Sequence, residues 1–232
     1  MTELFPQTQT SLEFTPPASP PEAGVRLEID AAGVGWILFD HPTKSVNVLN
    51  TPTMEKLRDL LDEAMRKDVS GLVFASDKPD MFVAGADIDE IAQVTDARLG
   101  AEKAAYGQSI FERIAGFPRP TATVITGPCL GGGYELALAT RLRIAEDSPR
   151  VRVGLPEVQL GILPGFGGTQ RLPRRAGLPT ALDMILSGKT LPAKPAFRRG
   201  LVDVLVPQGL GRSLAYEFVT HRRTFKSHEP GR

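Results

Sequence analysis

Three glycine-rich turns are the first features of this sequence that could take part in chemistry. They occupy residues 84–88, 131–135 and 161–169, and each follows a segment that is predicted to be a strand. Glycine allows a ligand to approach the backbone closely, and the first amides of a helix that follows such a turn have no partner inside the helix. Turns of this kind can therefore bind negative charge that develops during a reaction.

Two glutamates accompany these turns. Glu135 falls in the first turn of a helix predicted to start near Gly132, so its carboxylate leans toward the helix start, where the Gly132 N–H and the helix dipole also point. Glu157 follows Pro156 in a predicted loop. Amides could stabilise an enolate formed from a thioester, and carboxylates could move a proton at the adjacent carbon and activate water. Each feature also has an ordinary explanation: a tight connection, a charge that favours a helix start, or a solvated loop carboxylate.

The elements that would position these residues alternate along the chain. Apolar alternation predicts a hairpin of residues 25–29 and 34–39, with further strands at 71–75, 121–126, 142–145 and 150–153. Helical spacing predicts helices at 51–67, 99–117, 132–139, 169–176 and 180–186, the first with Thr51 as N-cap and Pro52 as its first residue. The repeated order of strand, strand and helix predicts an α/β domain.

Composition and charge exclude several classes of function. Lys plus Arg equals Asp plus Glu at 27 each, so no overall positive field is available to hold nucleic acid or an anionic membrane. The basic residues from Arg171 to Arg175, and those from Arg198 onward, are predicted to form a solvated face. No segment approaches the ~18 apolar residues of a spanning helix, and the start lacks the features of a signal peptide.

The reactive side chains narrow the chemistry further. Cys129 is the only cysteine, which excludes an internal disulfide or a cysteine-rich zinc site and favours a cytoplasmic location. We expect it to pack in the core, and we expect no metal site. The chain has no Gly-x-Ser-x-Gly elbow, and His41, His221 and His228 are predicted to lie at the surface, which argues against a serine hydrolase.

Three longer strings carry a resemblance to a known family. Residues 82–91 (FVAGADIDEI), 127–137 (GPCLGGGYELA) and 154–173 (GLPEVQLGILPGFGGTQRLP) resemble, in order and separation, the signatures of the enoyl-CoA hydratase/isomerase (crotonase) family. The likeness runs from about Val25 to Pro207 and is closest to the hydratase part of bacterial multifunctional fatty-acid-oxidation α subunits. It implies a crotonase-like spiral of ββα turns.

The resemblance also implies roles for individual residues. The N–H groups at Ala86 and Gly132 would form an oxyanion hole, Glu135 would activate water, and Glu157 would exchange a proton with the α carbon. Coenzyme A would be bound as part of the substrate, with segment 84–88 around its adenine end. The substrate-binding residues expected on this basis are Ala84, Asp87, Ile88, Gly131 and Lys44. Lys44 would lie near the coenzyme A phosphates, although an ordinary surface lysine is an equal alternative.

The sequence predicts three parts. Residues 1–24 are proline-rich and predicted to be a disordered tail, residues 25–207 form the crotonase-like domain, and residues 208–232 form a truncated helical segment or tail with one helix at 213–221. Crotonase domains normally continue into several helices that close over the acyl pocket, and this C-terminal helical part is expected to be largely missing. The chain has no dehydrogenase-type Gly-x-Gly-x-x-Gly turn after a strand, so NAD is expected only if a separate dehydrogenase part exists.

Hydration of a 2-enoyl-CoA thioester is the first choice of function, because both glutamates are present. One alternative is an isomerase of the same fold, in which Glu157 alone shuttles a proton. Another is a truncated acyl-CoA-binding module without activity, as a fragment of a multifunctional enzyme. The expected partners are an acyl-CoA thioester and either further copies of this chain or, at full length, a thiolase subunit.

Overall fold

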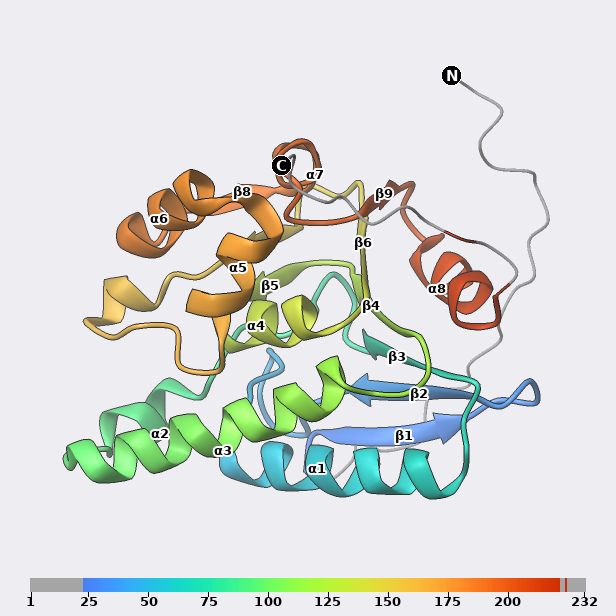
Figure 1. Cartoon of the computed structure of the whole chain (residues 1–232), viewed down its shortest axis with the longest axis horizontal. Helices are drawn as coiled ribbons and strands as arrows, with labels where there is room; N and C mark the ends of the chain where they lie inside the picture. Colours follow the sequence, from blue (N-terminus) through green and yellow to red (C-terminus); the bar gives the residue numbers. More distant parts are fainter. Residues whose placement is uncertain (1–22, 222–223, 225–232) are drawn as a thin grey trace.

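The computed structural model describes residues 23–221 and residue 224, and its largest unit is a six-stranded sheet (Figure 1). The strands, in their order across the sheet, are β1 (Val25–Ile29), β2 (Val34–Phe39), β3 (Gly71–Ser76), β4 (Thr121–Ile125), β6 (Leu142–Glu146) and β9 (Val204–Val206). β1 and β2 form the predicted antiparallel hairpin, and each later pair of neighbours is parallel. Parallel neighbours require crossover connections, which the helices supply.

A second, smaller sheet makes the chain a spiral. It contains β5 (Pro128–Leu130), β7 (Arg152–Gly154) and β8 (Thr190–Pro192), and Val83 is bridged to Cys129 of β5. Three times in succession, the chain passes through a strand of the large sheet, an extended segment of the small sheet and a helix. The helices that end these turns are α3 (Ala97–Ala115), α4 (Gly132–Ala139) and α5 (Gly168–Ala176). The predicted α/β fold, a spiral of ββα turns, is confirmed.

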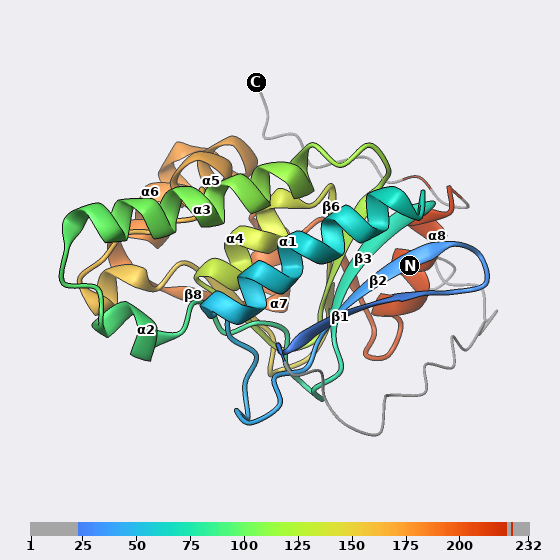
Figure 2. The same cartoon turned by 90° about the horizontal axis from the view of Figure 1, so that it is seen from below.

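Apolar side chains cover both faces of the large sheet. Because successive side chains of a strand point to opposite faces, Ile37 and Phe39 pack with α1 (Thr51–Arg66), α3 and α4, whereas Trp36 and Leu38 pack on the other face. That second face is covered by α8 (Gly211–Val219), as Figure 2 also shows. The helix predicted at 213–221 is therefore present, and it belongs to the core.

Two of the helix starts differ from what the sequence predicts. The N-cap of α1 is Asn50, whose side-chain oxygen accepts the Thr53 N–H at 2.9 Å, so the prediction of Thr51 as N-cap is wrong. α3 begins at Ala97, two residues before its predicted start, and is capped by Asp96, while Asp87 caps an unpredicted short helix, α2 (Ile88–Ala92). Asn and Asp cap helices at least as well as Thr, so a Thr-Pro pair alone does not locate the start.

Shorter elements complete the described part of the chain: η1 (Glu157–Leu160), α6 (Leu178–Ser187) and α7 (Ala193–Arg198). Of the predicted tail, only residues 23 and 24 are described, and the Gly24 carbonyl accepts the Asp40 N–H at 2.9 Å. The boundaries of the three predicted parts otherwise stay predictions. Among the described helices, none combines the length and the apolar character that a membrane crossing requires.

Candidate active site

Three neighbouring extended segments of the small sheet, which contain Val83, Cys129 and Val153, end at the same edge of that sheet. Val83, Cys129 and Val153 lie in one row across parallel neighbours. Since the segments run in the same direction, the residues that follow this row emerge at one edge. Within four residues of the row come the members of the candidate site, Ala86, Gly132 and Glu157.

Two backbone amides face this edge. Gly85 has a φ of 120° and Gly131 a φ of 51°, values that glycine adopts without steric cost. A methyl group on Gly85 would lie 3.2 Å from the Leu130 carbonyl oxygen and 3.8 Å from the Gly132 nitrogen, so the two turns approach each other closely. Within the part of the chain that the structure describes, the N–H groups of Ala86 and Gly132 donate to no other group, and both residues line one cavity.

Glu135 lies in the first turn of α4 and is 1% exposed. Its Oε1 accepts the Phe166 N–H at 2.8 Å and the Gly168 N–H at 2.7 Å. Burial raises the pKa of this carboxyl to about 7, although the two N–H donors and the positive charge of Arg171 oppose the rise. Both bonds go to Oε1, which leaves Oε2 for a molecule in the cavity.

Glu157 begins η1 and faces the same space. Its Oε2 is buried without a hydrogen-bond partner among the described residues, and a methyl group on Gly131 would lie 3.1 Å from its Oε1. Burial, and then the charge of Glu135, raise the pKa of Glu157 to about 7. Because Glu135 has two N–H donors and Glu157 Oε2 has none, a proton shared by the pair rests more favourably on Glu157. Such a pair can supply a base and an acid at one pH.

The cavity that contains both glutamates has a volume of about 870 Å³. Four of the five predicted substrate-binding residues line it, namely Ala84, Asp87, Ile88 and Gly131. The fifth, Lys44, is not among the lining residues. Its Nζ donates to the Asp87 carboxylate at 2.6 Å, and this hydrogen bond lowers the pKa of Asp87. Lys44 therefore contacts a residue of the cavity wall, Asp87, and does not itself line the cavity.

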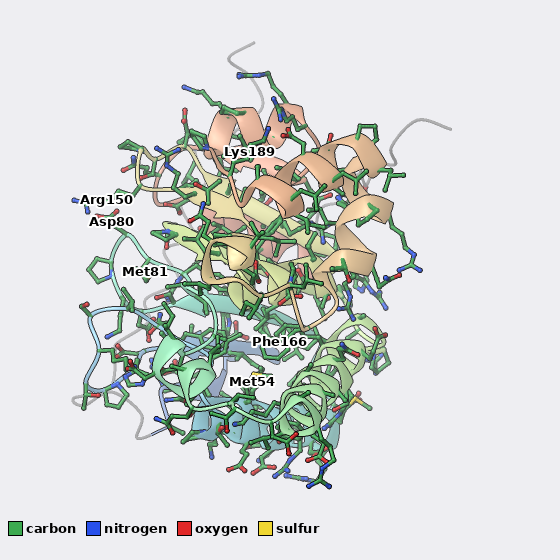
Figure 3. All side chains as sticks on the ribbon, turned by 90° about the vertical axis from the view of Figure 1, so that its left-hand side faces the viewer. Met54, Asp80, Met81, Arg150, Phe166 and Lys189 are labelled. Carbon is green, nitrogen blue, oxygen red and sulfur yellow. The ribbon has the colours of Figure 1, made fainter. Side chains whose placement is uncertain are left out.

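One part of the cavity wall is apolar. It is formed by α1, by α2 with the loop that follows it, by α3 and by loop 165–168, through Met54, Ile91, Val94, Ala104 and Phe166. Met54 and Phe166, both labelled in Figure 3, line this same cavity. A hydrocarbon chain can lose its contact with water here.

The backbone contacts of Glu135 were not predicted from the sequence. The third glycine-rich turn was identified, but its N–H groups were expected to face a ligand, whereas two of them hold Glu135. Backbone donors carry no signal in the residue type, and the glycines at 165, 167 and 168 were the only indication available. The prediction of a solvated Arg171 is also wrong, since its side chain is 13% exposed and donates to the Phe166 carbonyl.

Two further predictions about charged side chains are wrong. Arg175 is mostly buried and paired with Asp203, which Arg143 also binds at 2.6 Å. His41 is 8% exposed, and its Nδ1 accepts backbone N–H groups. Asp203 is brought to Arg175 only by the fold, whereas the partners of His41 are the nearby backbone N–H groups of Thr43 and Lys44, which leave no signal in the residue types. The prediction of an exposed His221 is confirmed, and His228 lies outside the described residues.

The side chains that commonly bind metals, and the thiol of Cys129, are the remaining reactive groups to place relative to this site. In the described ranges, no group of three or more His, Cys, Asp or Glu side chains is arranged to hold a metal ion. Cys129 is fully buried in the core, as predicted, and burial raises the pKa of its thiol well above the usual value. The polar groups that reach the cavity edge of the small sheet are therefore amides and carboxylates.

The spiral fold, with two amides and two buried carboxylates at one cavity, defines a crotonase-type domain. The chain belongs to the enoyl-CoA hydratase/isomerase family, whose model matches residues 30–221. A fatty acid oxidation complex subunit alpha from Aliivibrio fischeri is 44% identical over 196 residues, which make up 84% of this chain. The chain spans only 28% of the length of that relative.

Solved structures lead to the same fold. An enoyl-CoA hydratase from Bacillus anthracis has a TM-score of 0.78 at 30% identity, over 85% of this chain and 76% of the other. A human mitochondrial delta3-delta2-enoyl-CoA isomerase has a TM-score of 0.78 at 29% identity, over 88% of this chain and 79% of the other. Two different reactions thus occur among proteins that this chain resembles almost equally.

Proposed function

We propose that this domain hydrates 2-enoyl-CoA thioesters to 3-hydroxyacyl-CoA. The observation that carries the proposal is the pair of buried glutamates, Glu135 and Glu157, at a cavity that also receives the unpartnered amides of Ala86 and Gly132. Hydration requires a base, an acid and a site for a developing enolate oxygen, and the cavity has a group for each.

In this mechanism the thioester carbonyl oxygen accepts hydrogen bonds from the Ala86 and Gly132 amides. Oε2 of the ionised Glu135 takes a proton from water as the hydroxyl bonds to the β carbon, and the electron pair of the double bond moves toward the thioester oxygen. Protonated Glu157 then gives its proton to the α carbon. The product has gained one water, and a proton transfer from Glu135 to Glu157 through solvent restores the starting state.

The test is hydration of crotonyl-CoA, followed by loss of the ultraviolet absorbance of the conjugated thioester. We expect turnover by this chain and a loss on the order of a hundredfold or more in Glu135→Gln and in Glu157→Gln. Glu102→Gln is the matched control, because Glu102 lines the rim of the same cavity but is 60% exposed. Unchanged rates in both active-site variants would remove both assignments.

An isomerase is the second candidate, and its support is the likeness to the human enoyl-CoA isomerase. In that reaction one carboxylate moves a proton between carbons, and no water is added. Turnover of 3-enoyl but not 2-enoyl thioesters would favour it over hydration. Binding of coenzyme A thioesters without turnover of either would favour a non-catalytic module.

Coenzyme A is proposed to enter only as part of the substrate, bound along Ala84, Asp87, Ile88 and Gly131, with Lys44 behind Asp87. No other cofactor is proposed for this chain. Its relatives are named as subunits of a fatty acid oxidation complex, and we extend to this chain the proposal of assembly, with further copies of itself or with a thiolase subunit. A cytoplasmic location is proposed from the single, buried cysteine.

A further inference from the structure

Loop 165–168, whose N–H groups bind Glu135, also accepts hydrogen bonds from two side chains through its carbonyl groups. The Phe166 N–H donates to Glu135, and the carbonyl of the same peptide unit, that of Gly165, accepts from Gln108 Nε2 at 2.8 Å. In the next peptide unit, the Phe166 carbonyl accepts from Arg171 Nη1 at 2.9 Å. The N–H of that unit, on Gly167, also favours the ionised form of Glu135. Two side chains thus bind the carbonyl ends of peptide units whose N–H ends face the carboxylate.

Arg171 also ties this loop to α3. Its Nη2 donates to Glu112 Oε1 at 2.6 Å, and the guanidinium lies against Gly167 so closely that a methyl group there would not fit. The Phe166 ring packs edge-on against Phe111 of α3, with centroids 5.5 Å apart. Gln108, Phe111 and Arg171 therefore hold the loop against α3, and none of these three lines the cavity.

These contacts have an electrostatic consequence. A charged donor on a carbonyl polarises the peptide unit and makes its N–H a stronger donor, because hydrogen bonds in a chain reinforce one another at low dielectric. The positive charge of Arg171 also lies close enough to favour a negative Glu135. Both effects stabilise the ionised carboxylate against the cost of burial.

We infer that Arg171 is a positioning residue for the proposed hydration, holding loop 165–168 so that its N–H groups keep Glu135 ionised and aimed at the attacking water. Gln108 is a weaker second contact of the same kind, since its side chain is exposed. Arg171 does not line the cavity, so it acts through the loop and through its charge. The effect of Arg171 on the reaction rate rests on the proposed function, whereas its effect on the protonation of Glu135 does not.

The other charged groups near Glu135 must be held constant in a test. Glu157 of η1 faces it directly, and Glu112 of α3 is paired with Arg171. The rim of the cavity adds side chains from α1, α2 and α3, which are Glu55, Arg58, Asp87, Glu90, Glu102 and Lys103. None of these is altered in the variants below.

The experiment compares Arg171→Met, Arg171→Lys and Arg174→Met in crotonyl-CoA hydration as a function of pH. Met keeps the apolar stem and removes the donors and the charge, so we expect kcat to fall about tenfold or more, with KM changed less than about threefold. The acidic limb of the kcat profile should move to higher pH, because a carboxyl that loses a nearby positive charge binds its proton more tightly. Lys should recover part of both effects. Arg174, which is exposed and donates within its own helix, serves as the control.

A second readout does not depend on turnover. The infrared carboxyl band that is lost in Glu135→Gln reports the protonation of Glu135, and its midpoint should lie at higher pH in Arg171→Met than in the parent chain. If Arg171→Met does not fold, Gln108→Met should show a smaller shift in the same direction. An unmoved midpoint, or an equal shift in Arg174→Met, would overturn the inference. A parent chain without hydratase activity would refute the proposed function but leave this titration as a valid test.

Discussion

At the scale of single residues, Glu135 and Glu157 differ in what their oxygens contact. Glu135 accepts two N–H groups through Oε1, whereas Glu157 Oε2 has no partner in the described part of the chain. Both pKa values are raised to about 7 by burial, and the charge of Glu135 adds to the rise for Glu157. The pair therefore titrates as a unit near neutral pH.

This coupling predicts a bell-shaped pH dependence. The productive state has one proton on the pair, so kcat/KM for crotonyl-CoA should peak near pH 7 and fall on both sides. The acidic limb reports protonation of Glu135, and the alkaline limb reports loss of the proton of Glu157. Steady-state rates between about pH 5 and pH 9 give the profile. A rate that kept rising above neutral pH would contradict the role of Glu157 as the acid.

The same burial makes Glu157 a pH-dependent cost to stability. Its pKa in the folded chain, about 7, lies above the ordinary value of 4.5, so the folded state binds the proton more tightly between these values. The contribution of Glu157 to the free energy of unfolding is thus fully present below pH 4.5 and is lost as pH rises through 7. Glu157→Gln should therefore gain stability relative to the parent by about 1–3 kcal/mol over this range.

Thermal or urea unfolding of the two proteins at a series of pH values measures this difference. Glu102→Gln, at a side chain that is 60% exposed, is the control variant in the same series. A stability difference between Glu157→Gln and the parent that did not change with pH would show that Glu157 is not desolvated.

Residue types marked the two carboxylates and the three glycine-rich turns as candidates, and the resemblance of the strings around them to the family supplied their roles. They did not predict the partners of Glu135, since Phe166 and Gly168 act through their backbone. Arg171 and Arg175 were predicted to be solvated because a run of basic residues usually is. Their acidic partners, Glu112 and Asp203, are brought to them only by the fold.

At the scale of elements, α3 determines how much room the apolar part of the cavity has. Gly100, Ala104 and Gly107 share one face of this helix and line the cavity. Over seven residues this face spans about 10 Å. Glycine inside a helix costs about 1 kcal/mol relative to alanine, so its presence at 107 needs a reason, and the Phe166 ring occupies the space of a side chain there.

This geometry predicts a specific change in acyl-chain preference. The side chain of Ala104→Phe should extend into the apolar part of the cavity and displace the distal carbons of a long acyl chain, each worth ~0.8 kcal/mol when buried. We expect kcat/KM for dec-2-enoyl-CoA to fall about tenfold or more, while that for crotonyl-CoA changes less than about threefold. Ala105→Phe, at an exposed position on the same helix, is the control. Equal losses for both substrates would mean that the acyl chain lies elsewhere.

Long periodic elements were predicted well, and short ones were not. α1 and α3 each bury one apolar face, and β2 and β3 are nearly continuous apolar runs, so their patterns are visible in the sequence. The strands β5, β8 and β9 have three residues each, too few for a period to be visible. β5 and β8 nevertheless form the small sheet together with β7, and this sheet aligns the site, so a part of the fold close to the site could not be predicted from its pattern.

At the scale of the whole molecule, apolar side chains remain exposed on α6 and beside the cavity. Leu178, Leu182 and Leu186 repeat at every fourth residue of α6 and are 58%, 46% and 67% exposed. Leu160, the last residue of η1, and Leu163 are 51% and 66% exposed and also line the cavity, and η1 contacts α6. We call these five leucines the α6 surface. Apolar surfaces of this kind favour association, because burying them removes their contact with water.

The α6 surface predicts that the chain self-associates, which is one form of the proposed assembly. Sedimentation of the parent should show a species larger than one chain at micromolar concentration, and Leu182→Glu combined with Leu186→Glu should shift it toward the monomer, because two charges would be buried in the contact. Neither leucine lines the cavity, so hydration by a folded double variant reports whether the site needs the contact. Leu99→Glu, at an isolated leucine of α3 that is 41% exposed, should leave the distribution unchanged. A monomeric parent would show that copies of this chain do not cover the α6 surface, whereas dissociation in the Leu99 variant as well would place the contact on another face.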